Sequence, residues 1–160
     1  MRVYILRHGI AEDAPPGGSD AGRALTEEGK KKLRNVLTRA RAAGVRPSII
    51  LTSPLRRAVQ SAEIAAGVLG AKSELVESRA LLPSSSAPRV WDEIRGRSAE
   101  ELLIAGHEPL LSTVVAFLLR CPVLQVDLKR AALVSIDVET PAAEPHGVLN
   151  WLLTPKLAGR

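Results

Sequence analysis

The sequence predicts an α/β fold, a three-layer α/β/α sandwich in which helices cover both faces of a mainly parallel sheet. Apolar runs alternate with amphipathic runs along the 160 residues, which is typical of strands joined by right-handed helical crossovers. The last two strand candidates are joined by a loop, which predicts an antiparallel C-terminal hairpin at the sheet edge. The length fits a single domain over residues 1–160.

Six strands are expected where short runs of aliphatic and β-branched residues lie between turn residues. The candidates, in chain order, are Val3–Arg7, Ile49–Thr52, Ser73–Val76, Leu102–Ala105, Ala132–Val138 and Val148–Leu153. The first run is followed by a segment from Ile10 to Ala24 that contains two prolines beside two glycines, a composition that favours turns. We therefore expect this segment to be a loop, and to border the substrate entrance.

Helices are expected between these strands, at Glu27–Ala43, Pro54–Leu69, Ala87–Arg95 and Pro109–Leu119. Gly44 fits the C′ position that ends the first helix. Ser53 fits the N-cap of the second helix, with Pro54 at its first position.

Candidate functional residues follow three of the predicted strands. Arg7 and His8 end the first strand, Arg57 follows the second strand in the first turn of a helix, and His107 follows the fourth. Carboxyl ends of parallel strands meet at one edge of a sheet, where α/β proteins bind ligands. A cation in the first turn of a helix opposes the helix dipole unless an anion lies there, and phosphate matches both the arginine fork and the helix terminus.

These segments resemble the histidine phosphatase superfamily, and within it the small phosphohistidine phosphatases of the SixA type. The resemblance extends over nearly the whole chain, and the matching segments are Val3–Gly9 (the RHG strand), Arg23–Gly29, Ser53–Ser61, Ala105–Leu110 and the closing run from Leu149 to Lys156. It implies a fold like that of phosphoglycerate mutase. It also implies that His8 is the nucleophile that becomes phosphorylated, and that Arg7, Arg57 and His107 bind the phosphoryl oxygens.

Elementary chemistry agrees with these implied roles. In phosphoryl transfer the protein mainly holds the phosphoryl group in place and neutralises the charge on its oxygens, and it has little covalent chemistry to perform. A neutral imidazole can attack phosphorus, and we expect nearby cations to lower the pKa of His8 and keep it neutral. We expect His107 to act protonated, drawn to the dianion that it contacts.

Many members of the wider superfamily carry a general-acid carboxylate after the third strand, but the segment Ser78–Ser84 holds no acid. An alkoxide leaving group needs a proton, whereas the imidazole released from a phosphoramidate is a weak base. The absence points to substrates with a P–N bond. The remaining acid candidates are Glu77, Glu12, Asp13 and Asp20.

Three function classes follow. The favoured one is a phosphatase that hydrolyses phosphohistidine on a signalling or phosphocarrier protein, such as a histidine-containing phosphotransfer domain, because the short chain leaves no room for a cap that would enclose small metabolites. The alternative enzyme is a phosphomonoesterase for small phosphate esters. A phosphate-binding module without turnover is the non-enzymatic alternative.

Composition narrows the remaining classes. The net charge is +5, but much of the excess lies on one helix, and aromatic residues make up only 2% of the chain, so no specific nucleic-acid partner is expected. A single cysteine, Cys121, excludes an internal disulfide and fits a reducing compartment. No metal cluster, cofactor motif, signal peptide or membrane span is recognisable, so we expect no cofactor and a cytoplasmic location.

Overall fold

The computed structural model describes residues 1–70, 72–139 and 142–159, which form a six-stranded sheet in the order β3-β2-β4-β1-β5-β6. Strands β1 (Arg2–Arg7), β2 (Ile49–Thr52), β3 (Glu74–Glu77) and β4 (Glu101–Gly106) pair in parallel. Strand β5 (Leu133–Val138) is antiparallel to β1, and β6 (Gly147–Leu153) forms the antiparallel edge. The predicted α/β class and C-terminal edge hairpin are confirmed.

Four of the helices lie where the amphipathic patterns predict them, with shifts at some of their ends, and the short last helix was not predicted. They are α1 (Glu27–Ala42), α2 (Arg56–Leu69), α3 (Ala87–Arg95), α4 (Leu110–Leu118) and the short α5 (Pro155–Ala158). The single turns η1 (Asp20–Gly22) and η2 (Arg79–Leu81) are 3-10 helices. Ala43 caps α1, and Gly44 follows at a φ of 90°, a conformation that favours glycine, as expected.

The predicted start of α2 is wrong. The helix begins at Arg56 with Leu55 as its N-cap, whose extended backbone lies outside the helix. The Ser53 hydroxyl instead accepts a hydrogen bond from the Leu55 backbone N–H at 3.2 Å, and this turn delays the helix by two residues relative to Pro54.

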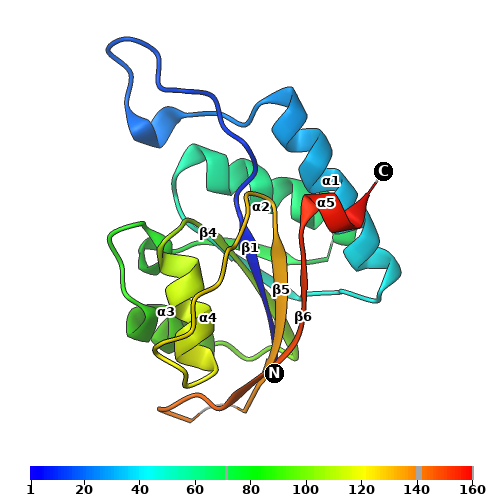
Figure 1. Ribbon diagram of the computed structural model, residues 1–160, viewed down its shortest axis with the longest axis vertical. Coiled ribbons are helices and arrows are strands. Elements are labelled where there is room, and N and C mark those ends of the chain that lie inside the picture. Colours follow the sequence, from blue (N-terminus) through cyan, green and yellow to red (C-terminus); the bar gives the residue numbers. More distant parts are fainter. Residues whose placement is uncertain (71, 140–141, 160) are drawn as a thin grey trace.

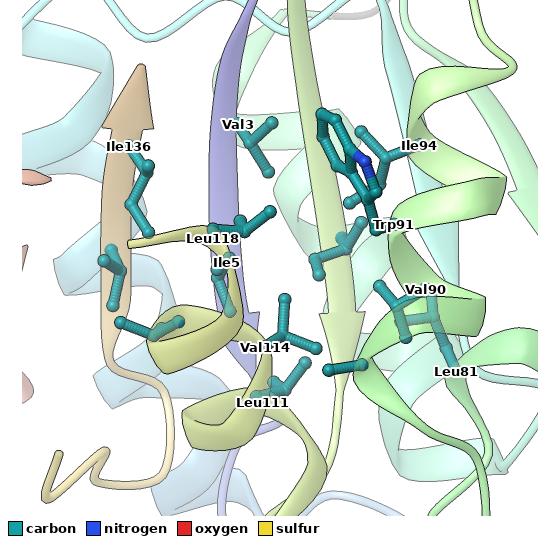
Figure 2. Close-up of a cluster of buried hydrophobic side chains, with 14 of the residues drawn as sticks. Val3, Ile5, Leu81, Val90, Trp91, Ile94, Leu111, Val114, Leu118 and Ile136 are labelled. Carbon is teal, nitrogen blue, oxygen red and sulfur yellow. The ribbon is translucent and has the colours of Figure 1, made fainter. Parts of the chain in front are cut away.

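Two apolar layers hold the helices to the sheet. Because successive strand residues point to opposite faces, Val3 and Ile5 of β1 join one layer, while Tyr4 and Leu6 join the other. Helices α3 and α4 cover the first face, and α1, α2 and α5 cover the second (Figure 1). The first layer centres on the fully buried Trp91, packed among side chains of α3, α4 and the sheet (Figure 2).

The loop predicted from Ile10 to Ala24 leaves the carboxyl end of β1 and projects beyond the body of the fold (Figure 1). It is irregular apart from η1 and a single bridge between Ala11 and Leu25. The carboxyl ends of the four parallel strands face this same end of the sheet, so the fold delivers the residues that follow β1, β2 and β4 to one region beside the loop.

Candidate active site

His8 and His107 leave two neighbouring parallel strands at the same level. Arg7 pairs with Gly106 in the β1–β4 register, and the His8 backbone N–H donates to the Gly106 carbonyl at 3.0 Å. Each histidine directly follows the last residue of its strand, so the two rings come together with their centroids 5.1 Å apart. The structure therefore brings together two of the four residues singled out in the sequence through strand register alone.

The hydrogen bonding of His8 fixes its tautomer. The ring Nδ1 lies 2.7 Å from the carbonyl oxygen of Gly9. A carbonyl only accepts, so Nδ1 carries the hydrogen of the neutral ring. The lone pair of neutral His8 is consequently on Nε2, the nitrogen available for attack on an electrophile.

Burial keeps His8 neutral. The residue is 8% exposed, and this burial is the main cause that lowers its pKa from 6.5 to about 4. The cations of Arg57, Arg7 and Arg23 lower the pKa further, while the hydrogen bond to Gly9 opposes the change. The lowered pKa expected from the sequence is confirmed, although desolvation contributes more to it than the neighbouring charges.

Without a bound dianion, the ring of His107 is neutral. It is 2% exposed, and burial together with the charges of His8 and Arg57 lowers its pKa to about 3. Its Nε2 lies 2.7 Å from the hydroxyl of Ser53, which directly follows β2. Residues that follow β1, β4 and β2 are therefore in contact with one another. In the protein alone His107 is therefore neutral, and a proton on this ring must come with an anionic ligand.

Arg7 and Arg57 each donate a hydrogen bond from Nη1 to a backbone carbonyl. Nη1 of Arg7 donates to the Leu128 carbonyl at 2.9 Å, and Nη1 of Arg57 donates to the Asp20 carbonyl at 3.0 Å. In both residues Nε is buried and has no partner among the described residues. Nε and the adjacent Nη2 form the side-on edge of a guanidinium, the edge with which Arg2 binds both oxygens of Asp137 in this protein.

Unsatisfied buried polar atoms concentrate at this site. In the described part of the chain four buried side-chain atoms lack a partner, and three of them are Arg7 Nε, Arg57 Nε and His107 Nδ1; the fourth is the Ser85 hydroxyl. Folded proteins rarely leave such groups unpaired because each costs about 1–3 kcal/mol. An anion with several acceptor oxygens is the ligand class that would satisfy the two guanidinium N–H groups, and His107 Nδ1 as well when that nitrogen carries a hydrogen.

The carboxylates considered in the sequence lie in different places. Asp20 is brought to the site, where its side chain binds Arg57 Nη2 at 3.2 Å and Arg23 Nη1 at 3.1 Å. Glu77 ends β3 on the surface, and Glu12 and Asp13 are exposed in the loop. The hydrogen bond from Arg23 is the main cause that lowers the pKa of the Asp20 carboxyl, so Asp20 is ionised and holds no proton to donate near neutral pH.

Two supporting residues could not be recognised from sequence alone. The hydroxyl of Ser61, fully buried in α2, accepts from the Gly9 backbone N–H at 3.1 Å and donates to the Arg57 carbonyl at 2.7 Å. It thereby ties the exit of β1 to the helix that carries Arg57. The Leu128 carbonyl, the anchor of Arg7, lies in a loop without a sequence pattern of its own. The one sequence signal for the role of Ser61 is its position four residues after Arg57, which places the two residues on the same face of a helix.

The described residues contain no cluster of three or more His, Cys, Asp or Glu side chains arranged to hold a metal ion. Over the same residues, no helix is both long enough and apolar enough to cross a membrane.

Comparisons with known proteins agree with the geometry. The sequence pattern of the histidine phosphatase superfamily (branch 1) matches residues 3–81. An uncharacterized protein of Picosynechococcus sp. is 38% identical over 112 residues, which are 68% of this chain and 67% of that protein. The structure of the protein histidine phosphatase SixA complexed with tungstate is similar with a TM-score of 0.85 and 27% identity, over 98% of both chains.

A structure from Agrobacterium tumefaciens, assigned to the phosphohistidine phosphatase SixA, has the same fold with a TM-score of 0.81 and 20% identity, over 96% of this chain and 97% of that one. Shared fold, matching family pattern and a relative above 30% identity converge on one assignment. The chain belongs to branch 1 of the histidine phosphatase superfamily and is a phosphatase that resembles SixA.

Proposed function

We propose that this phosphatase hydrolyses phosphohistidine on a signalling or phosphocarrier protein through a covalent phospho-His8 intermediate. The observation that carries the proposal is the set of buried nitrogens on Arg7, Arg57 and His107 that lack partners beside a neutral His8. These nitrogens come from different segments, and none has a hydrogen-bond partner among the described residues. A phosphoryl group supplies several acceptor oxygens at once.

In the first step Nε2 of His8 attacks phosphorus. A bond forms between Nε2 and phosphorus while the bond between phosphorus and the substrate imidazole breaks. The substrate ring carries a hydrogen on its other nitrogen, so it takes the bonding pair and departs as neutral imidazole. The side-on edges of Arg7 and Arg57 bind equatorial oxygens, and the positive charge of both arginines offsets the charge that develops on them.

In the second step a water oxygen attacks the phosphorus of phospho-His8. The bond to Nε2 breaks, the water proton leaves with the phosphate or the solvent, and His8 returns to its neutral form. Because the pKa of His8 is about 4, the released ring stays unprotonated at neutral pH and can attack again without losing a proton first.

The state of the carboxylates supports a P–N substrate. Asp20, the carboxylate that binds Arg57 directly, is held ionised by arginines, and Glu77, Glu12 and Asp13 are exposed. An alkoxide leaving group benefits from a positioned acid by about a hundred- to ten-thousand-fold. The imidazole of phosphohistidine leaves without a proton on the departing nitrogen when its other ring nitrogen carries a hydrogen, because the group released is then neutral imidazole, a far weaker base than an alkoxide.

The test compares turnover of a phosphorylated histidine-containing phosphotransfer domain, phosphoramidate and a sugar phosphate. We expect release of phosphate from both P–N substrates and slow turnover of the sugar phosphate. His8→Ala should abolish turnover, whereas the matched His146→Ala, which removes an exposed histidine, should not.

Faster turnover of the sugar phosphate would favour the phosphomonoesterase alternative instead. Binding of the phosphoprotein by the unaltered chain, without phosphate release and without a labelled enzyme, would identify a phosphate-binding module.

A further inference from the structure

We propose that Asp20 is a positioning residue for Arg57, which it holds by one edge so that the other edge faces the phosphoryl group. This inference rests on the proposed function and adds to it a residue outside the histidines and arginines already assigned. The guanidinium of Arg57 has five N–H donors. The inference follows from which of these donors bind the protein and which remain for the ligand.

The contacts of Asp20 occupy one defined edge of Arg57. Nη1 donates to the Asp20 backbone carbonyl at 3.0 Å, and Nη2 donates to the Asp20 carboxylate Oδ2 at 3.2 Å. Together these nitrogens form the end-on edge of the guanidinium. The side-on edge, made of Nε and the second hydrogen of Nη2, is left, and its Nε is buried without a partner.

The anchor of Arg57 differs from that of Arg7. Arg7 is held by the Leu128 carbonyl, whereas Arg57 receives both a carbonyl and a carboxylate from one residue. A planar guanidinium held by two acceptors on one edge cannot rotate without breaking both bonds. Asp20 therefore fixes the plane of Arg57 as well as its position.

Asp20 is itself fixed from the other side. Its Oδ1 accepts from Arg23 Nη1 at 3.1 Å, while Arg23 Nε donates to the Glu12 carbonyl at 2.8 Å. The projecting loop is thus tied to α2 through the chain of contacts from Glu12 to Arg23, Asp20 and Arg57. This arrangement makes the loop part of the phosphate-binding site.

A carboxylate near a phosphate site also repels the ligand, so the two effects must be weighed. The Asp20 side chain is 63% exposed, and solvent and salt screen the charge of such a group. The Arg57 side chain is only 7% exposed, so its direction depends on its hydrogen bonds. Positioning therefore outweighs repulsion, and removal of the carboxylate should weaken anion binding.

The experiment measures the Kd of inorganic tungstate by titration calorimetry at pH 7.5 for the unaltered protein, Asp20→Asn and Asp20→Ala. Loss of the charge-assisted contact is expected to weaken tungstate binding by about tenfold in both variants. The matched control is Asp92→Asn, because Asp92 forms a similarly exposed ion pair with Arg95. It should leave the Kd within about twofold, since surface pairs contribute little.

Turnover separates positioning from acid catalysis. We expect kcat/KM of Asp20→Asn to fall by a similar factor for phosphoramidate, p-nitrophenyl phosphate and an alkyl phosphate, because Arg57 contacts the group common to all three. A loss confined to the alkyl phosphate, with tungstate binding unchanged, would show that Asp20 is a general acid. Tighter tungstate binding by the variants would show that Asp20 competes with the ligand.

Either of these results overturns the inference, as does an unchanged Kd in variants whose thermal unfolding matches that of the unaltered protein. Failure of the proposed function looks different. In that case the unaltered protein itself would release no phosphate from P–N substrates, whatever the Asp20 variants do.

Discussion

At the scale of single residues, the proposed chemistry depends on two buried histidines that the fold keeps neutral. The pKa of His8 is lowered to about 4 and that of His107 to about 3, mainly by burial. His8 alone has its hydrogen fixed on Nδ1 by a carbonyl acceptor. Neutrality thus comes from desolvation, and the choice of nucleophilic nitrogen comes from one hydrogen bond.

This state predicts a definite spectrum. In nitrogen-15 NMR of imidazole-labelled protein, His8 should show a protonated Nδ1 and an unprotonated Nε2, and the signals of both buried rings should stay nearly constant from pH 8 to pH 6. The measurement needs His8→Gln and His107→Gln for assignment. A His8 ring that titrates near pH 6.5, or that carries its hydrogen on Nε2, would contradict the account.

Arg57 provides a second prediction at this scale. Arg57→Lys keeps the charge but removes the fork, so it should reduce kcat/KM by about a hundredfold or more, as expected when an oriented donor to the transition state is lost. Arg56→Lys is the matched control, because the neighbouring Arg56 is exposed. If Arg57→Lys changed kcat/KM as little as Arg56→Lys does, charge alone would matter at this end of α2.

The sequence allowed prediction of the candidate site residues that lie at or after the ends of apolar strands. Arg7, His8, Arg57 and His107 follow apolar strands, and the family resemblance assigns roles to them. The neutral state of His107 and the ionised state of Asp20 were not predictable, because both depend on burial and on partners distant in the sequence. The hydroxyl of Ser53, expected to cap a helix, binds His107 instead.

At the scale of elements, the strongly patterned segments were predicted almost to the residue. The limits of β2 and α3 coincide with the predicted ones, and in the structure the Ser86 side chain caps the start of α3. The short α5 was not predicted, since four residues carry too little periodicity. Helix α4 begins one residue after the predicted Pro109, within the usual uncertainty of helix ends.

The packing of α1 against the exit of β1 yields a prediction at this scale. A Cβ at Gly29 would lie 2.3 Å from the carbonyl oxygen of Ile10, a backbone atom, whereas a Cβ at Gly67 in α2 would meet nothing within 4 Å. Gly29→Ala should therefore destabilise the protein by about 1–3 kcal/mol. Gly67→Ala should stabilise it by up to about 1 kcal/mol, because alanine favours helix.

Urea unfolding of the two glycine variants checks these signs. Their opposite directions serve as mutual controls, since both changes add one methyl group within a helix. A stabilising Gly29→Ala would show that α1 moves freely relative to the segment after His8.

At the scale of the whole molecule, the sequence predicts the class of the sheet but leaves the strand order open. Strand β4 lies between β2 and β1 in the sheet. The β1–β4 pairing therefore joins Arg2–Arg7 to Glu101–Gly106, two segments that are far apart in the sequence. Local patterns predict that both segments are strands, while the choice of partner depends on packing across both layers. This non-local pairing is what brings the two histidines together.

The buried histidines also affect the stability of the whole molecule. In the unfolded chain both rings bind protons near pH 6.5, whereas in the folded protein His8 and His107 do so only near pH 4 and pH 3. Between these values the unfolded state binds more protons, so the free energy of unfolding falls as the pH is lowered. Each histidine contributes up to about 1.4 kcal/mol per pH unit.

Urea unfolding from pH 7.5 to pH 4.5 measures this slope. We expect full stability above pH 6.5 and a steady loss below it, with a shallower slope in the double variant His8→Gln with His107→Gln. Identical slopes in the two proteins would mean that neither ring is held neutral by the fold.

The most direct test of the central claim is to identify the phosphorylated residue during turnover. Radiolabelled phosphohistidine protein is mixed with the enzyme, quenched in base within milliseconds, and digested for mass spectrometry. We expect a base-stable, acid-labile label on Nε2 of His8 that disappears in His8→Asn. Phosphate release with the label on another residue, or with no labelled enzyme at any time, would contradict it.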